Sequence, residues 1–275
     1  MNHLPRELPF PTARNRPVDM LKYANPTLFL GLVARLVPWL AGATAVTLAV
    51  GLWGAFFAAP ADYQQGETVR IMYIHVPAAW LSTFCYATMT ASALGTLVWR
   101  HPLADAAQKA AAPIGAAFTF ICLVTGSLWG KPMWGTWWVW DARLTSVLVL
   151  FVIYLGLIAL WRTIEEPSRA ARAAAILTLV GVVNLPIIKF SVDWWNTLHQ
   201  PASVFRLGGP TIAPSMLWPL LVLALGFTLL FLTLHLLATR NEILRRRVRR
   251  LSIQAATGGS NEAPAHRLSA TGATP

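Results

Sequence analysis

A tryptophan-rich segment carries the residues whose types and spacing could do chemistry. The segment WGKPMWGTWWVWDARLTS spans residues 129–146 and holds five of the chain's 13 tryptophans, Trp129, Trp134, Trp137, Trp138 and Trp140. An aromatic belt at a membrane surface explains one or two tryptophans at each span end, but not five within twelve positions. Stacked indole rings suit a large, flat, apolar ligand, because ring stacking adds to the burial of apolar area. We therefore favour a ligand-binding surface, with an aromatic belt as the alternative.

The spacing of these tryptophans suggests how they could form one surface. If residues 133–141 form a short helix, Trp134, Trp137, Trp138 and Asp141 share one face at i, i+3, i+4 and i+7. Such a helix would lie along the membrane surface. It would expose a flat indole platform to a planar ligand.

Two histidines, His75 and His199, lie in segments that we expect to face outward. Neutral imidazole is a good iron ligand, and two imidazoles on opposite faces would clamp a haem iron. The alternative for each residue is an interfacial histidine that hydrogen-bonds to water or backbone. Zinc is less favoured, because it needs three or four ligands and the outward acids show no recognisable spacing. The other four histidines lie in tails, in an inward loop or in the last span: His3, His101, His235 and His266.

Outward cations could meet the two carboxylates of a haem. Arg143 is the best candidate, because it adjoins the tryptophans. Asp141, two residues earlier, could instead pair with Arg143 and orient it. The other candidate cations are Arg70, Lys131 and Arg206.

The elements that position these residues are predicted to be membrane helices. The 275-residue chain is 56% hydrophobic and 12% charged, with a mean hydropathy of +0.53, whereas soluble domains contain about 25% charged residues. A span needs roughly 20 apolar residues. We predict an all-α integral membrane protein with six transmembrane helices, with a kink near Asn184 and Pro186 in the fifth. The predicted spans are 36–58, 76–98, 110–129, 144–161, 173–192 and 215–238.

The predicted domain organisation is a single membrane domain between two tails. Residues 1–30 form an N-terminal tail, residues 31–240 form the six-helix domain, and residues 241–275 form a second tail. The basic run RNEILRRRVRR, residues 240–250, marks the start of this second tail, which is expected to be disordered after Ala255. The arginine run is interpreted as a headgroup anchor, with docking to a cytoplasmic partner as the alternative.

The distribution of basic residues predicts the orientation. Only five of the 22 lysines and arginines fall in the loops 59–75, 130–143 and 189–214. Positively charged loops stay in the cytoplasm, so both termini are expected to be cytoplasmic and the tryptophan-rich loop periplasmic. The chain is thus predicted to be a multi-pass protein of a bacterial inner membrane, embedded in the lipid bilayer. This topology accounts for the net charge of +11, and nucleic acid is not an expected partner.

Several activities find no support in the sequence. Cys85 and Cys122 lie in apolar runs and form no CxxC motif, which excludes a thiol oxidoreductase or a c-type cytochrome. No nucleophile–base pair and no ATP-binding loop occurs, so the chain is not expected to be an enzyme by itself. A haem-translocating permease would need polar groups at mid-membrane depth, where Asn184 is the main candidate. A haem-dependent enzyme, such as a lyase, remains a further alternative.

The block from Trp134 to Asp141, WGTWWVWD, resembles the signature of the haem-handling WWD proteins of cytochrome c biogenesis. The similarity is greatest to the CcmC type, haem exporter protein C, and it extends to His75 in YIHVPAAW and His199 in NTLHQP. Larger relatives follow the tryptophans with WDPxE and use more spans. This chain has Asp-Ala-Arg-Leu-Thr at that place and six predicted spans.

The resemblance implies a function in haem delivery. Proteins of this family present haem b on the outer face of the membrane to a CcmE-type haem chaperone, which passes it to apocytochromes c. They associate with a CcmD-type small subunit and with a CcmA/CcmB-type ABC transporter. The resemblance implies that His75 and His199 are axial haem ligands. It also implies that residues 129–143 form the contact surface for haem and chaperone.

Overall fold

The computed structural model describes residues 25–201 and 203–261, with side chains up to residue 257. Six helical segments are long and apolar enough to cross a membrane, which confirms the predicted all-α membrane architecture. A π-helical turn, Gly54–Ala58, extends the first helix, and a 3-10 turn, Glu67–Ile71, precedes the second. The α-helices are α1 (Pro26–Trp53), α2 (Met72–Val98), α3 (Pro102–Trp134), α4 (Ala142–Thr163), α5 (Pro167–Gly181), α6 (Asn184–Trp194) and α7 (Pro214–Asn261).

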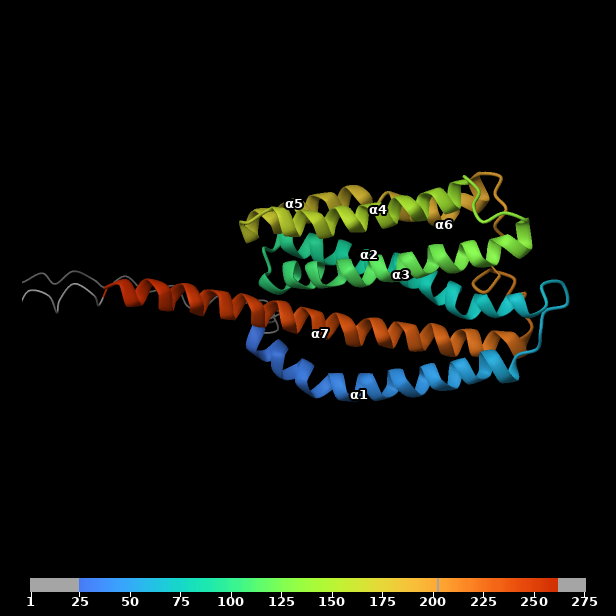
Figure 1. Ribbon diagram of the computed structural model, residues 1–275, viewed down its shortest axis with the longest axis horizontal. Helices are drawn as coiled ribbons and strands as arrows, with labels where there is room; N and C mark the ends of the chain where they lie inside the picture. The colour runs from blue at the N-terminus through green and yellow to red at the C-terminus, as the bar shows by residue number, and fades with distance from the viewer. Residues whose placement is uncertain (1–24, 202, 262–275) are drawn as a thin grey trace, which may run out of the picture.

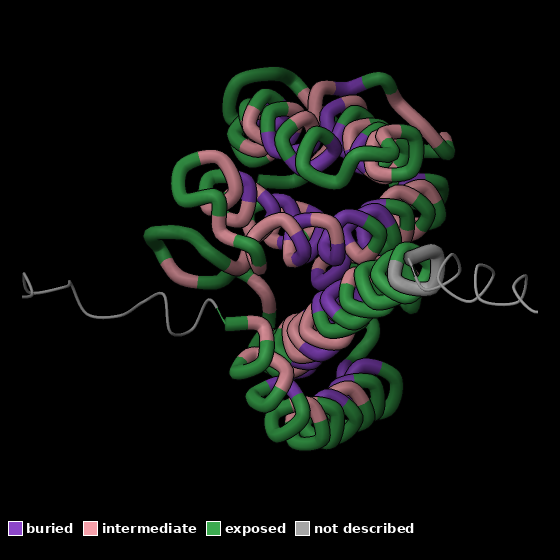
Figure 2. Tube along the Cα trace, turned by 90° about the vertical axis from the view of Figure 1, so that its left-hand side faces the viewer, coloured by how far each residue is buried: buried purple, intermediate pink, exposed green. Residues whose placement is uncertain are grey.

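The helices pack in three layers (Figure 1). The pair α2 and α3 lies in the middle, with α4, α5 and α6 on one side and α1 and α7 on the other. Buried positions gather in the middle of the bundle, and exposed positions cover its outer faces (Figure 2). Exposed side chains such as Trp39 and Phe57 are apolar because lipid, not water, is the solvent for a span.

The fifth span is broken, as the sequence predicted. A turn at Val182 and Val183 separates α5 from α6. Pro186 lies in the first turn of α6, where its missing N–H leaves no gap in the helical hydrogen bonds. Asn184 is buried and its Nδ2 donates to the Ser146 carbonyl of α4 at 2.9 Å. The break therefore ties α6 to α4 and directs it toward the loops at that end.

Two tyrosines fix α2 against its neighbours in the buried interior. Tyr86 Oη donates to the Thr178 carbonyl of α5 at 3.0 Å, and Tyr154 Oη of α4 donates to the Ser82 carbonyl at 2.8 Å. Gly115 of α3 has no side chain to keep the Tyr154 ring away. These contacts hold the middle layer against α4 and α5, and so fix the register of the helices that carry the site.

The helices extend further than the predicted spans. α1 begins at Pro26, inside the expected tail of residues 1–30. α7 is a 48-residue helix that projects well beyond the bundle (Figure 1), about 72 Å at 1.5 Å per residue. It runs to Asn261, so residues 256–261 are helical rather than disordered as expected. Residues 1–24 and 262–275 lie outside the described part of the chain.

Candidate functional site

The end of the bundle that carries segments 59–66, 135–141, 195–201 and 203–213, called here the loop end, contains a cavity of about 510 Å³. Side chains of α2, α3, α4 and α6 line it, together with Trp138 of the α3–α4 loop and His199 of the segment after α6. His75 and His199, separated by 124 positions in the sequence, both line this cavity. The fold thus brings together the two histidines that the sequence singled out.

The proton on His75 can be assigned from its neighbours. Its Nδ1 lies 3.1 Å from the Cys122 carbonyl and 3.1 Å from Thr125 Oγ1. The Thr125 hydroxyl donates its own hydrogen to the Ile121 carbonyl at 2.6 Å, so both neighbours of Nδ1 are acceptors. Nδ1 must carry the proton, which leaves Nε2 with a free lone pair for a metal. Neither α3 group was singled out from the sequence.

His199 has a carboxylate in the corresponding place. Its Nδ1 lies 3.7 Å from Asp141 Oδ2, just beyond hydrogen-bond distance, and neither buried atom has a hydrogen-bond partner among the described residues. A small rotation would close the gap and fix the proton on Nδ1. Burial, helped by the Arg143 charge, lowers the pKa of His199, and Asp141 opposes part of that shift. The imidazole is therefore neutral at pH 7, as metal ligation requires.

The loop between α3 and α4 is not the predicted short helix. α3 ends at Trp134 because Gly135 adopts the left-handed conformation, with φ of 75° and its N–H donating to the Lys131 carbonyl at 3.0 Å. Asp141 then caps α4, with Oδ1 accepting from the Leu144 N–H at 2.7 Å. The glycine at the expected helix's third position explains the error, since it terminates one helix rather than continuing another.

The five tryptophans therefore do not form a single flat platform. Trp134 and Trp138 line the cavity, and the Trp134 ring lies 5.0 Å from the His199 ring, centroid to centroid. Trp137 and Trp140 are 54% and 76% exposed on the outside of the loop. Trp129 packs edge-on against His75 at 5.8 Å and donates to Gln65 Oε1 at 2.9 Å.

One predicted cation lines the cavity. Arg143 donates from Nε to Ser191 Oγ at 3.0 Å and from Nη2 to the Lys189 carbonyl at 3.2 Å. No ion pair joins it to Asp141 in the described part of the chain, which goes against the alternative of an Asp141–Arg143 pair; Asp141 instead caps α4 and faces His199. Lys189 also lines the cavity. The sequence marked it only as one of five outward cations.

The other three candidate cations lie outside this cavity's lining. Arg70 pairs with Glu67 and donates to the Ala55 carbonyl. Lys131 donates to the Gly135 carbonyl at 2.9 Å and lies 5.9 Å from the centre of the Trp137 ring. Arg206 lies in the exposed loop after α6. Arg70 and Lys131 therefore organise the loop end, and of the four predicted cations Arg143 alone lines the cavity.

The cavity is lined by charged, polar and apolar side chains. Its two cations, Arg143 of α4 and Lys189 of α6, lie about one helical turn nearer the loop end than the apolar Val147 and Leu185 on the same helices. Among the described residues no group of three or more His, Cys, Asp and Glu side chains could hold a metal ion. The arrangement suits a planar, mostly apolar ligand that carries anionic groups at one edge and accepts two nitrogen ligands at its centre.

Fold and site together define a six-span helical membrane protein with a paired-histidine cavity at one end of its bundle. The chain matches the family CcmC, heme exporter protein C, over residues 19–254. It belongs to that family.

Curated relatives cover most of the chain. A protein of Bradyrhizobium diazoefficiens named heme exporter protein C is 69% identical over 240 residues, which cover 87% of this chain and 91% of the relative. The Escherichia coli K12 protein of the same name is 57% identical over 78% of this chain and 86% of its own length. The Paracoccus denitrificans protein of that name is 46% identical over 84% and 96%.

Proposed function

We propose that this protein binds haem b as a transient cargo at the periplasmic face of a bacterial inner membrane and delivers it to a CcmE-type chaperone for cytochrome c maturation. A CcmD-type subunit and a CcmA/CcmB-type ABC transporter are the expected partners in this process. Relatives covering most of the chain bear the name heme exporter protein C, which supports haem as the cargo. The proposed activity is binding and presentation, not bond-making catalysis.

One observation carries the proposal: His75 and His199 line the same cavity, each with an oxygen acceptor near its Nδ1. Such acceptors hold an imidazole in the tautomer and orientation that leave Nε2 available to iron. Trp134 and Trp138 supply ring surface beside a porphyrin. Arg143 and Lys189 are placed to neutralise its carboxylates.

Release of the cargo requires a surface that a chaperone can approach. The exposed rings of Trp137 and Trp140 provide one at the outer side of the same loop. Aromatic side chains of this kind are frequent in protein interfaces, because they bury much area for little lost side-chain entropy. We infer that the inner tryptophans hold haem and the outer ones meet the chaperone.

Visible spectra of the purified protein test the ligands. The His75→Ala, His199→Ala double variant should lose the spectrum of a six-coordinate haem, and each single variant should weaken or alter it. His101→Ala is the matched control, because His101 lies at the opposite end of the bundle, in the turn before α3. Full haem content in the double variant would refute the proposal.

Reporter fusions test the orientation. A reporter enzyme that is active only in the periplasm should be inactive after Pro275 and active within residues 130–140. The opposite pattern would place the cavity on the cytoplasmic side and contradict presentation to a periplasmic chaperone.

A further inference from the structure

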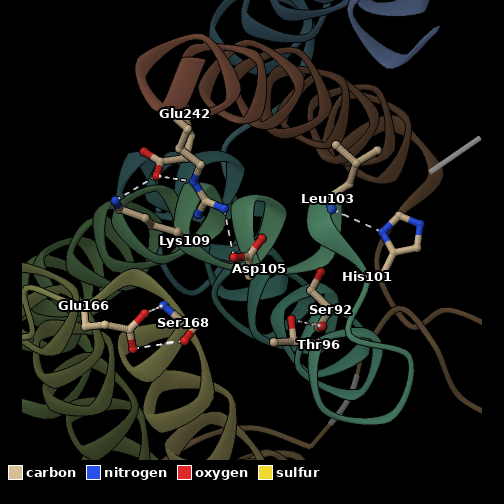
Figure 3. A network of polar contacts seen from close by, with 10 residues as sticks. Ser92, Thr96, His101, Leu103, Asp105, Lys109, Glu166, Ser168 and Glu242 are labelled. Atoms are coloured by element: carbon tan, nitrogen blue, oxygen red, sulfur yellow. Dashed lines mark hydrogen bonds and ion pairs between the residues drawn. The ribbon is translucent and has the colours of Figure 1, made fainter. Parts of the chain in front are cut away.

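A second cavity lies at the end of the bundle opposite the histidine site. Its volume is about 300 Å³, and it sits where α2 ends and where α3 and α5 begin. Since these helices are predicted to span the membrane, the cavity lies at a membrane boundary. Figure 3 shows part of its surroundings, including His101, Asp105 and Ser168. The residues that line it include Thr96, Arg100, His101, Asp105, Ser168 and Arg172.

Two arginines in this cavity have no carboxylate partner among the described residues. Arg100 and Arg172 line it from different segments, and neither forms an ion pair with a carboxylate in the described part of the chain. His101 adds a donor, because its Nδ1 accepts from the Leu103 N–H at 3.2 Å. The proton of the neutral ring is then on Nε2.

The one carboxylate in the cavity wall is already paired. Asp105 Oδ2 accepts from Arg246 of α7 at 2.8 Å. Arg246 also binds Glu242, which accepts from Lys109 at 2.9 Å (Figure 3). The remaining Asp105 oxygen, Oδ1, is buried and has no hydrogen-bond partner among the described residues. A buried carboxylate oxygen of this kind needs a donor to offset its desolvation.

We propose that this cavity binds the phosphate of an anionic headgroup, with Arg100 and Arg172 as its cationic partners. Basic pockets between helices at a membrane boundary bind anionic lipid headgroups, and guanidinium groups hold phosphate through paired hydrogen bonds. A headgroup with hydroxyls, such as that of phosphatidylglycerol, also supplies a donor for Asp105 Oδ1. Free phosphate has the same anionic chemistry, but it lacks the acyl chains that also hold a lipid at the membrane boundary.

Native mass spectrometry of the full-length protein in detergent tests the proposal. Wild-type protein is titrated with phosphatidylglycerol, with phosphatidylcholine and with inorganic phosphate. The test variant is Arg100→Gln, Arg172→Gln. The charge-matched control is Arg162→Gln, Arg240→Gln, which removes two exposed arginines outside the cavity lining. Arg100→Lys, Arg172→Lys keeps both charges, and a thermal melt confirms that every variant is folded.

The test variant should bind phosphatidylglycerol about 25-fold more weakly than wild type, from roughly a fivefold loss for each arginine. The control should retain wild-type affinity, and the lysine variant should recover most of the loss. If millimolar phosphate displaces the lipid from wild-type protein but not from the test variant, the cavity is an anion site whose occupant is free phosphate. Equal loss in test and control variants would show diffuse charge attraction and overturn the proposal. So would unchanged lipid binding in a folded test variant, or equal binding of phosphatidylcholine.

Discussion

Replacing Asp141 by Asn separates the two tasks that the structure gives this side chain. Oδ1 caps α4 by accepting from the Leu144 N–H at 2.7 Å, while Oδ2 faces His199 Nδ1 at 3.7 Å. Asn caps helices about as well as Asp, so the free energy of unfolding should change by only a few tenths of a kcal/mol. The charge that orients His199 is lost in the same variant.

The expected cost falls on haem affinity. Removing an outer partner of a ligating histidine lowers metal affinity by about 10- to 100-fold, which corresponds to about 1.4–2.7 kcal/mol. Protonation of His199 is not the cause, because Asp141 raises the pKa of this residue. Loss of the carboxylate lowers that pKa further and keeps the ring neutral. Asp141→Ala should add a destabilisation of about 1 kcal/mol through the lost cap.

Two measurements on the same preparations decide the matter. Haem titration followed by absorbance gives the affinity, and thermal or denaturant unfolding gives the stability. The reasoning predicts that Asn and Ala variants share the affinity loss but differ in stability. Wild-type haem affinity in the Asn variant would refute the role of Asp141 in orienting His199. Equal stability of the two variants would refute its role as a cap.

Three further predictions follow from the same geometry. Burial lowers the pKa of His199, so haem affinity should stay constant from pH 8 to about 6.5, the ordinary pKa of histidine, and fall only below that. Below the same pH the unfolded chain binds the proton more readily than the folded chain, so stability should begin to decline. An affinity titration with a midpoint above pH 7 would contradict this. Trp138→Ala should lower haem occupancy through a stacking loss of about 0.5–1.5 kcal/mol, whereas Trp140→Ala should preserve occupancy and slow chaperone loading; identical effects in spectra and transfer assays would remove the distinction between inner and outer rings. Gly115→Ala forces a methyl group against the Tyr154 ring and should lower the free energy of unfolding by about 1–3 kcal/mol. Gly42→Ala is the control, because Gly42 has open space beside it, and it should not destabilise the protein.

The spans were predictable because the bilayer imposes a length and a polarity on every one of them. A run of about 20 apolar residues between polar loops predicts a transmembrane helix. The break near Asn184 follows from the local backbone chemistry of Pro186. Helix ends were harder to predict. α7 continues well beyond the predicted span, because the arginine-rich segment after the span favours a helix although its hydropathy is low.

The sequence by itself singled out His75, His199, Arg143 and the tryptophans, because such residues are unusual in membrane loops. It did not single out Lys189 among the outward cations, and it offered no way to find Thr125 or the Cys122 carbonyl, since these acquire a role only by lying beside a distant residue.

Tertiary structure alone decided how the site is assembled. Gly135 ends α3 by adopting a positive φ, and this turn divides the tryptophans between the cavity and the exterior. Asp141 faces His199 across 58 positions of sequence because α6 turns back against α4. Local periodicity determines which residues share a face of one helix, but only the packing of several helices determines which faces meet.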